Sequence, residues 1–159
     1  MIQIRPATPS DVPLIRAFIH DLAEYEREPH SVHITEEQLL QDGFGKDRYY
    51  ECLIAEADGT PAGFALFFPI YSTWQGRSLH LEDLFVRPAF RGHGIGKALF
   101  GRVAALAVER GCTRLQWDVL DWNKPAIDFY RSLNAVMHGD WRRMRIAGDD
   151  LRALAGVTA

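Results

Sequence analysis

A glycine-rich segment flanked by positive charges carries the strongest chemical signal in the sequence. The segment consists of Arg91, Gly92, His93, Gly94, Ile95, Gly96 and Lys97, and a long helical pattern follows it. Glycines at alternate positions let the backbone curl so that successive N–H groups point toward one place. The N-terminus of the following helix adds positive electrostatic potential at the same place. We therefore predict that this segment binds a pyrophosphate.

Two known phosphate-binding motifs do not fit this segment. A P-loop has the form Gly-x4-Gly-Lys-Ser/Thr, but Ala98 follows Lys97 and an arginine occupies position 91. A Rossmann fingerprint has the form Gly-x-Gly-x-x-Gly and follows an early strand. Here the glycines alternate, and they lie in the middle of the chain. The alternative to phosphate binding is a glycine-rich connection that only makes a tight turn.

The pattern of apolar residues predicts the elements that position this segment. Strands are expected at 2–5, 50–57, 62–71, 79–86 and 115–120, with two further short strands at 136–138 and 142–146. Helices are expected from the N-cap Ser10 to about Leu22, from a Thr35–Gln38 capping box to Gly43 or Gly45, at 94–110, at 124–133 and near the C-terminus. Asp58-Gly59 is typical of a hairpin turn. This order of elements predicts an α/β (α+β) layer architecture.

The composition excludes several classes of protein. The 159 residues match the size of one domain, 1–159. A net charge of −3 provides no overall basic surface for nucleic acid and leaves only a local basic strip open. No apolar run reaches the ~20 residues that a membrane-spanning helix requires. Cys52 and Cys112 lie in apolar runs, which excludes a disulfide scaffold. The close pair His30 and His33 has no carboxylate or thiol at metal-ligand spacing. We expect a soluble, cytoplasmic protein without a metal, nucleic-acid or membrane partner.

The glycine-rich segment resembles the Arg/Gln-x-x-Gly-x-Gly/Ala signature of the GCN5-related N-acetyltransferase (GNAT) superfamily. Other segments resemble its diamine (spermidine/spermine) and thialysine acetyltransferase branch, in the same order and over nearly the whole chain. These segments are Tyr25-Glu26, Asp42-Gly43-Phe44-Gly45, Tyr71-Ser72-Thr73-Trp74, Leu81-Glu82-Asp83-Leu84-Phe85-Val86, Asp121-Trp122-Asn123 and Phe129-Tyr130. The resemblance implies a mixed, mostly antiparallel central sheet flanked by helices. It also implies transfer of an acetyl group from the co-substrate acetyl-CoA to a primary amine of a polyamine, a diamine or a lysine analogue.

Two departures from the branch concern the C-terminal region. Leu133-Asn134-Ala135 stands where the branch has Leu-Gly-Ala. We expect Asn134 to end the helix, because asparagine tolerates a positive φ. The segment 135–141 is short for the branch and has Asp140 as its one acidic residue, which leaves the preferred length of the amine open. Acetylation of a protein or peptide amine, and a CoA-binding regulatory module without turnover, are the alternative functions.

The resemblance also assigns the contacts with acetyl-CoA. The pyrophosphate would lie on 91–97, the pantetheine along Leu84, Phe85 and Val86, and Asn123 and Ala126 on the other side of the co-substrate. A backbone N–H of the strand could stabilise an oxyanion at the reacting carbonyl. Asn123 as the N-cap of the helix at 124–133 is an equally good interpretation.

Two side chains are candidates for proton transfer. Tyr130 matches the position that the family uses as the general acid for the departing CoA thiolate, and a packed core aromatic is the alternative. Glu82 is the candidate base for the amine, which is an ammonium ion at neutral pH. It would act directly, through water, or only by attracting the cation, and an ordinary surface residue is the alternative. Strand alternation predicts that Glu82 shares a face with Leu84 and Val86. Asp83 would lie on the opposite face.

A small cationic substrate requires acidic and aromatic side chains around it. The candidates for the amine pocket are Tyr25, Glu26, Glu82, Asp83, Trp117, Asp118 and Trp141. The branch forms homodimers through its strands near the C-terminus, where Trp141, Met144 and Ile146 supply apolar surface in this chain. The resemblance therefore implies a homodimer.

Overall fold

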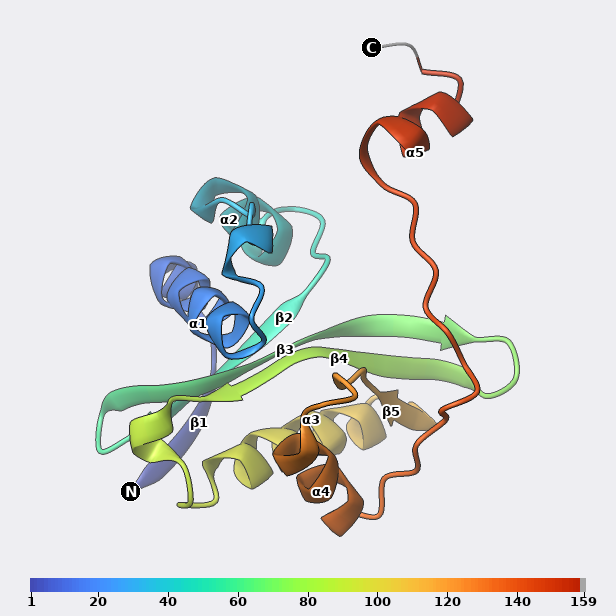
Figure 1. Ribbon diagram of the computed structural model, residues 1–159. Helices are drawn as coiled ribbons and strands as arrows, with labels where there is room; N and C mark the ends of the chain where they lie inside the picture. Colours follow the sequence, from blue (N-terminus) through green and yellow to red (C-terminus); the bar gives the residue numbers. More distant parts are fainter. Residues whose placement is uncertain (158–159) are drawn as a thin grey trace. The chain divides into compact units, whose positions relative to one another are not determined.

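The computed structural model describes residues 1–157 of the chain (Figure 1). The chain forms two compact units, Met1–Leu120 and Asp121–Ala159. The first unit holds the sheet and three of the described α-helices. The second unit holds two further described α-helices, joined by an irregular segment.

The first unit is built on a mixed, mostly antiparallel sheet. Within residues 1–120 the strands are β1 (Ile2–Pro6), β2 (Glu51–Ala57), β3 (Thr60–Ser72), β4 (Gly76–Val86) and β5 (Arg114–Gln116), in the spatial order β1-β2-β3-β4-β5. The first four strands pair antiparallel, and β4 and β5 pair parallel. The predicted sheet is thereby confirmed, although β5 is shorter than the strand expected at 115–120.

The turn between β2 and β3 confirms the predicted hairpin. Asp58 and Gly59 both have positive φ angles, 48° and 78°, and Ala57 pairs with Thr60 across the turn. Positive φ at both central residues matches the twist of the flanking strands. The hairpin therefore sets the pairing of β2 with β3 next to the turn, up to a register shift between Ala55 and Glu56.

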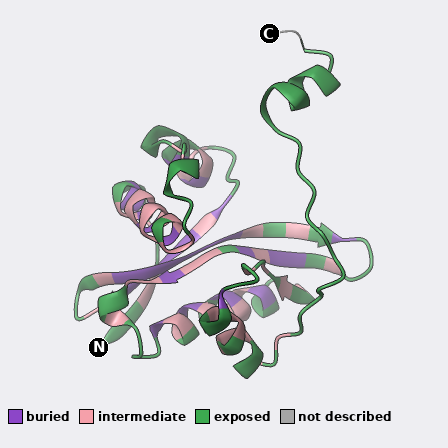
Figure 2. Ribbon diagram, viewed as in Figure 1, coloured by how far each residue is buried: buried purple, intermediate pink, exposed green. Residues whose placement is uncertain are grey.

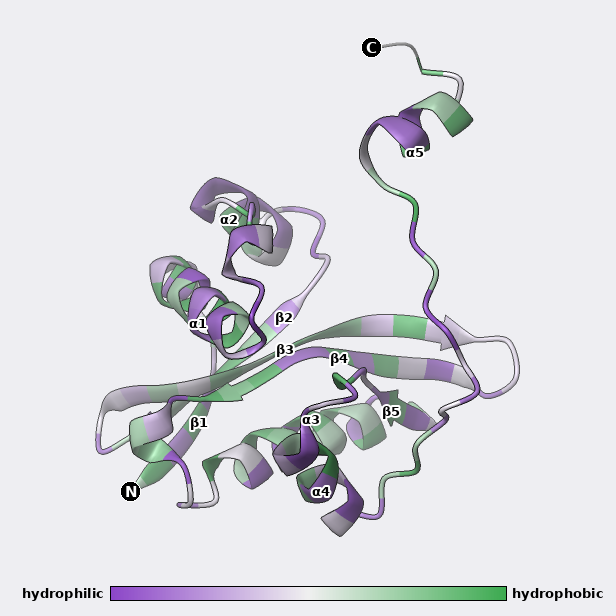
Figure 3. Cartoon of the chain, in the orientation of Figure 1, coloured by the Kyte–Doolittle hydropathy of each residue, from purple (hydrophilic) through white to green (hydrophobic). Residues whose placement is uncertain are grey.

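Helices cover both faces of this sheet (Figures 1 and 2). The helices α1 (Val12–Tyr25) and α2 (Glu36–Phe44) pack on one face, and α3 (Ile95–Glu109) packs on the other. On the first face the fully buried rings of Phe18 and Phe64 stack with their centroids 5.2 Å apart. On the second face Leu99 and Val103 are fully buried against the strands. Each face has its own apolar core, and hydrophilic residues dominate α2 on its outer side (Figure 3).

A carboxylate rather than Ser10 organises the start of α1, so the predicted N-cap was wrong. Ser10 lies inside the 3-10 turn η1 (Pro9–Asp11). The backbone N–H of Thr8 donates to Asp11 Oδ2 at 2.7 Å, and Arg5 donates to both Asp11 oxygens at 2.8 and 2.9 Å. These hydrogen bonds from Arg5 lower the pKa of Asp11 to about 2. Asp11 is the N-cap residue of α1, but its carboxylate accepts from Arg5 and Thr8 and not from the first N–H groups of the helix.

The predicted capping box of α2 is confirmed. The Gln38 N–H donates to Thr35 Oγ1 at 3.1 Å, and the Thr35 N–H donates to Gln38 Oε1 at 3.0 Å. The helix ends at Gly45, whose N–H donates to the carbonyl of Gln41. Two more 3-10 turns, η2 (Pro29–Ser31) and η3 (Pro88–Phe90), precede α2 and α3.

The second unit consists of α4 (Lys124–Ser132), an irregular segment and α5 (Gly148–Leu154). The strands expected at 136–138 and 142–146 do not form, so that prediction was wrong. Short apolar runs resemble strands in sequence, but a strand also needs a neighbour to pair its N–H and C=O groups. Within the described part of this unit, no other segment supplies such a neighbour.

Candidate active site

The glycine-rich turn leads from β4 into α3. Gly92 and Gly94 have φ angles of 80° and 79°, in the left-handed region, and Gly94 is the N-cap of α3. A Cβ added at either glycine would meet no atom within 4 Å, so the space in front of the backbone is open. The first N–H groups of an α-helix have no partner within the helix. The turn therefore combines open space, exposed N–H groups and a helix N-terminus, as a phosphate requires.

The side chains of this turn differ in what they can contribute. Ile95 is fully buried in the core under α3, so only its backbone is available to a ligand. His93 and Lys97 are exposed. Arg91 is exposed as well, but its Nε donates to the carbonyl of Val86 at 2.9 Å. This bond directs the Arg91 side chain back along the end of β4.

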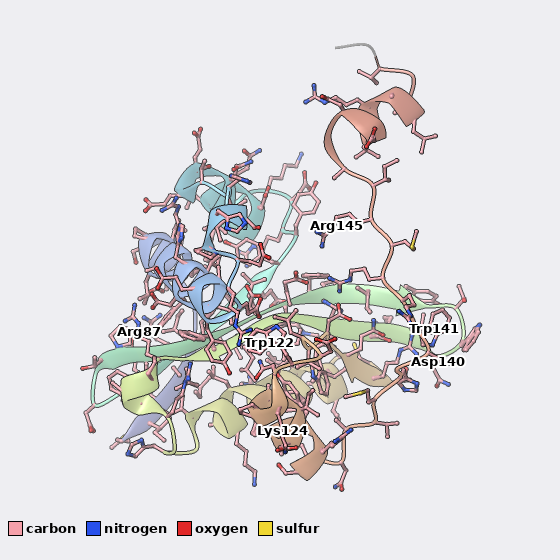
Figure 4. All side chains as sticks on the ribbon, in the orientation of Figure 1. Arg87, Trp122, Lys124, Asp140, Trp141 and Arg145 are labelled. Atoms are coloured by element: carbon pink, nitrogen blue, oxygen red, sulfur yellow. The ribbon has the colours of Figure 1, made fainter. Side chains whose placement is uncertain are left out.

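Arg87 fixes the end of β4 to α1 (Figure 4). Its Nε donates to Asp21 Oδ2 at 3.0 Å, and its guanidinium lies over the ring of Phe18, 4.6 Å from the centroid. The Arg87 N–H donates to the carbonyl of Ala62 on β3. The glycine-rich turn therefore follows a residue that is held by both α1 and β3.

A β-bulge in β4 determines where the candidate base points. Asp83 pairs with Leu66 of β3, and Leu81 pairs with Phe67, so Glu82 is an extra residue in β4. Such an insertion interrupts the alternation of side chains along a strand. Leu81 and Leu84 consequently both belong to the core under α3. Glu82 and Asp83 both lie on the opposite face, toward α1 and α2.

The bulge corrects the alternation that the sequence predicted. Glu82 does not share a face with Leu84 and Val86, which pack against the core under α3. Asp83 is next to Glu82 on the same face instead of opposite to it. Phe85 belongs to the core under α1, as the position after the bulge requires. Regular alternation held on both sides of the bulge and failed only where the extra residue occurs.

Three carboxylates meet on this face. Burial, together with the negative charges of Glu82 and Glu26, raises the pKa of Asp83 to about 7. Burial and the charge of Glu82 also raise the pKa of Glu26, which follows the last residue of α1. These shifts show that the three groups repel one another electrostatically. A bound cation would relieve this repulsion.

A histidine that the sequence analysis did not single out contacts this cluster. Nε2 of His80 lies 3.1 Å from Oε2 of Glu82, within hydrogen-bonding distance. The His80 ring also stacks on Phe68, with the centroids 5.1 Å apart. Residues two apart on a strand share a face, so the spacing of His80 and Glu82 was the signal that could have identified the pair.

The other candidates for the amine pocket fall in different places. Tyr25 is the last residue of α1, beside Glu26. Trp117 packs edge-on against Phe100 of α3, on the sheet face opposite to Glu82, so the structure does not bring it to the cluster. Asp118 follows β5 and is exposed.

The candidates in the second unit lie on α4 and after it. The Asn123 side chain accepts a hydrogen bond from the Ala126 N–H at 3.3 Å, so the predicted helix cap is confirmed. Asn134 ends α4 with a φ of 64°, as predicted from its tolerance of this conformation. Tyr130 lies on α4, with its ring 5.3 Å from that of Phe129. Asp140 and Trp141 lie together on the irregular segment, where the Trp141 side chain is exposed (Figure 4).

Two broader properties of the described residues bear on the chemistry. None of the helices among residues 1–157 has the combination of length and apolar character that crossing a bilayer requires. In the same part of the chain, no group of three or more His, Cys, Asp or Glu side chains is arranged to hold a metal ion.

The mixed, mostly antiparallel sheet flanked by helices is the fold that the resemblance to the GNAT superfamily implied. Residues 15–135 match the acetyltransferase (GNAT) family. The chain belongs to this family and is an N-acetyltransferase, as its resemblance to the GNAT signature predicted. Enzymes of the family use acetyl-CoA as their co-substrate.

Several known proteins are similar to this chain over nearly its full length. It is 42% identical to thialysine N-epsilon-acetyltransferase of Sus scrofa, with 98% of each chain covered. It is 38% identical to the enzyme of the same name in Caenorhabditis elegans, with 96% of each covered. An integron cassette protein of V. cholerae superimposes with a TM-score of 0.79 and 97% coverage of each chain at 23% identity, which supports the fold.

Proposed function

We propose that the protein transfers the acetyl group of acetyl-CoA to a primary amine of a small cationic molecule, of which thialysine, diamines and polyamines are examples. The observation that carries this proposal is that Glu26, at the end of α1, and Glu82 and Asp83, on the same face of β4, are close enough for their charges to raise the pKa values of Glu26 and Asp83. A charged amine would be held there by the groups that otherwise repel one another. The similarity to thialysine N-epsilon-acetyltransferases supports the same class of substrate.

The residues of the first unit fit the co-substrate. A side chain at Gly92 or Gly94 would project into the open space in front of the turn, which supports a role for these glycines in phosphate binding. Among the described strands, β5 pairs with β4 only at Ser78–His80, and β4 continues to Val86 beyond that pairing. The β4 edge from Leu84 to Val86 therefore has backbone groups available to the pantetheine amides, as an added strand would use them.

In this proposal the backbone N–H groups of 92–96 and the side chains of Arg91, His93 and Lys97 hold the pyrophosphate. Acetyl-CoA supplies the activated acetyl group. Glu82 accepts a proton from the ammonium form of the amine, directly or through water, because the nitrogen otherwise has no lone pair. Tyr130 donates a proton to the sulfur of the departing CoA. Asn123 and Ala126 contact the co-substrate, and Tyr25, Glu26 and Asp83 hold the cation.

We also propose that residues 1–159 act as one domain, in the cytoplasm, as a homodimer. The match to the GNAT family runs from residue 15 to 135 and so extends across the boundary between the two units. The irregular segment after α4 exposes Val136, Trp141 and Met144, with exposed fractions of 77%, 71% and 91%. Apolar side chains exposed to this degree are typical of an interface. Light scattering at micromolar concentration tests the proposed homodimer, and the mass of a monomer would contradict it.

The function is tested by incubating the protein with acetyl-CoA and a series of amines while free thiol is measured. We expect thiol release with thialysine, diamines or polyamines, and a much weaker signal with aromatic primary amines, which are uncharged at neutral pH. A lysine-containing peptide serves as the competing substrate class. Acetylation of the peptide alone would show a protein acetyltransferase, and CoA binding without thiol release from any amine would show a binding module.

A further inference from the structure

His80 is held in a fixed position beside Glu82. Its ring stacks on Phe68 of β3 at an interplanar angle of 29°, and only 12% of the side chain is exposed. Its backbone pairs with Phe68 on β3 and with Gln116 on β5, so His80 lies in the fully paired part of β4. The backbone of His80 is therefore held by both neighbouring strands, and the ring is held by its stacking on Phe68.

Glu82 is positioned much less firmly by the backbone. It is the extra residue of the β-bulge, and 47% of its side chain is exposed. Its negative charge raises the pKa of Asp83, next to it on β4, and of Glu26, at the end of α1. A glutamate in this position would turn toward solvent if nothing attracted it. The hydrogen bond to His80, 3.1 Å from Nε2 to Oε2, supplies that attraction.

The chemistry of the two groups determines the direction of this hydrogen bond. An ionised carboxylate only accepts hydrogen bonds, so the imidazole donates through its Nε2–H. The bond occupies Oε2 and leaves the second oxygen, Oε1, for the substrate. A base whose carboxylate is held in one orientation meets the proton of the amine in the required geometry.

We propose that His80 is a positioning residue of the active site: its Nε2–H holds the Glu82 carboxylate so that Oε1 faces the ammonium group of the substrate. This inference rests on the proposed function, because it requires Glu82 to act on the amine. His80 itself does not contact the substrate or take part in proton transfer. Its effect is exerted through the orientation of Glu82.

Three variants separate the hydrogen bond from the packing of the ring. His80→Phe keeps an aromatic ring on Phe68 and removes the donor. His80→Gln returns an N–H near the position of Nε2 without the ring. His80→Asn has its N–H near the position of Nδ1, too short to reach Glu82. We expect kcat/KM for the amine to fall about tenfold in His80→Phe and His80→Asn, the loss of one hydrogen bond to a charged group. His80→Gln should keep most of the wild-type kcat/KM, because its N–H restores the hydrogen bond to Glu82.

Two further readouts distinguish positioning from a structural role. The KM for acetyl-CoA should stay near the wild-type value in all three variants, and the melting temperature should stay near it in His80→Phe, which keeps an aromatic ring stacked on Phe68. In a Glu82→Gln background, His80→Phe should cause no further loss, because the group through which His80 acts is already altered. His33→Gln, at an exposed histidine in a loop, is the matched control and should leave every parameter unchanged.

Each contrary outcome has its own meaning. Full activity of His80→Phe together with a strong loss in Glu82→Gln would overturn the role of His80 and leave the proposed function intact. Full activity of Glu82→Gln would overturn the proposed role of Glu82. An equal loss from His80→Phe with and without the Glu82 substitution, or no recovery in His80→Gln, would also overturn the positioning role.

Discussion

The guanidinium of Arg91 lies over the aromatic ring of Tyr25, with Cζ 5.0 Å from the ring centroid. Tyr25 ends α1, next to the acidic cluster, and Arg91 begins the glycine-rich turn. The same guanidinium lies 5.5 Å from the centroid of Phe85 on β4. One side chain therefore connects the proposed phosphate-binding turn with the proposed amine-binding residues. A substitution of Arg91 should affect both substrates.

We expect Arg91→Ala to raise the dissociation constant of CoA and the KM for the amine, each about tenfold, because a charged contact and the support of Tyr25 are lost together. Arg91→Lys should weaken CoA binding less than it raises the amine KM, because an ammonium keeps the charge but does not stack on an aromatic ring as a planar guanidinium does. Calorimetry with CoA and steady-state kinetics with the amine measure the two effects.

The control for these variants is Arg102→Ala. Arg102 lies on α3 and pairs with Glu109 on the same helix, away from the turn. Its loss should leave both parameters unchanged. If Arg91→Ala alters CoA binding but not the amine KM, the contact with Tyr25 has no part in holding the amine.

Much of the fold could be predicted because the relevant signals are local in the sequence. The Thr35–Gln38 capping box, the Asp58-Gly59 hairpin and the stop of α4 at Asn134 each depend on a few neighbouring residues, and all three are confirmed. Two of them rest on a backbone angle that only a few residue types adopt readily. The glycine-rich turn before α3 was likewise predicted from a few neighbouring residues.

The conformation of the turn leads to a matched pair of substitutions. Gly94 and Gly76 both have positive φ angles, 79° and 90°, and a Cβ at either would meet no atom within 4 Å. Alanine at each position should therefore cost about 1 kcal/mol of stability, from backbone strain alone. Only Gly94→Ala should also weaken CoA binding, by tenfold or more, because its Cβ occupies the space proposed for the pyrophosphate. Equal CoA affinity in the two variants would contradict that assignment.

The features that the sequence did not predict depend on non-local pairing. The bulge at Glu82 exists only because Asp83 and Leu81 pair with consecutive residues of β3, and nothing in the order 81–86 shows that one residue is skipped. The face that Glu82 shares with Asp83 was hidden for the same reason. Likewise, the composition of 136–146 is compatible with strands, but the chain described here offers them no neighbour.

The raised pKa of Asp83 predicts how stability depends on pH. The ordinary pKa of 3.8 applies to the unfolded chain, and the folded value is about 7. The folded state therefore binds this proton more tightly, so the contribution of Asp83 to stability is largest below about pH 4 and falls as the pH rises to about 7. Asp83→Asn cannot ionise, so its stability should exceed that of the wild type by roughly 1–3 kcal/mol at pH 8 and by much less at pH 4.

Urea unfolding at several pH values measures this difference. Asp47→Asn, at an exposed aspartate in the loop before β2, is the control and should follow the pH dependence of the wild type. A constant difference between Asp83→Asn and the wild type from pH 4 to pH 8 would mean that Asp83 is already ionised in the folded state at low pH. The electrostatic description of the cluster would then be wrong.

Tyr130→Phe tests the proposed general acid. The substitution keeps the ring that contacts Phe129, and it keeps the Tyr130 carbonyl that accepts the N–H of Ala135 at 3.1 Å, so α4 should retain its end. CoA affinity should change little, because a donor to sulfur matters mainly when negative charge develops there. Turnover should fall by ~10²–10⁴, the usual contribution of a positioned acid. The high-pH limb of the kcat profile, which reports an essential acid, should move or vanish.

The exposed Tyr49 provides the comparison, because Tyr49→Phe removes a hydroxyl of the same chemistry from a loop. Its kcat and pH profile should equal those of the wild type. Single-turnover measurements of thiol release place the defect of Tyr130→Phe in the chemical step rather than in product release. Wild-type turnover with an unaltered pH profile in Tyr130→Phe would leave this tyrosine as a packing residue. The proton for the departing sulfur would then have to come from solvent or from another side chain near the thioester.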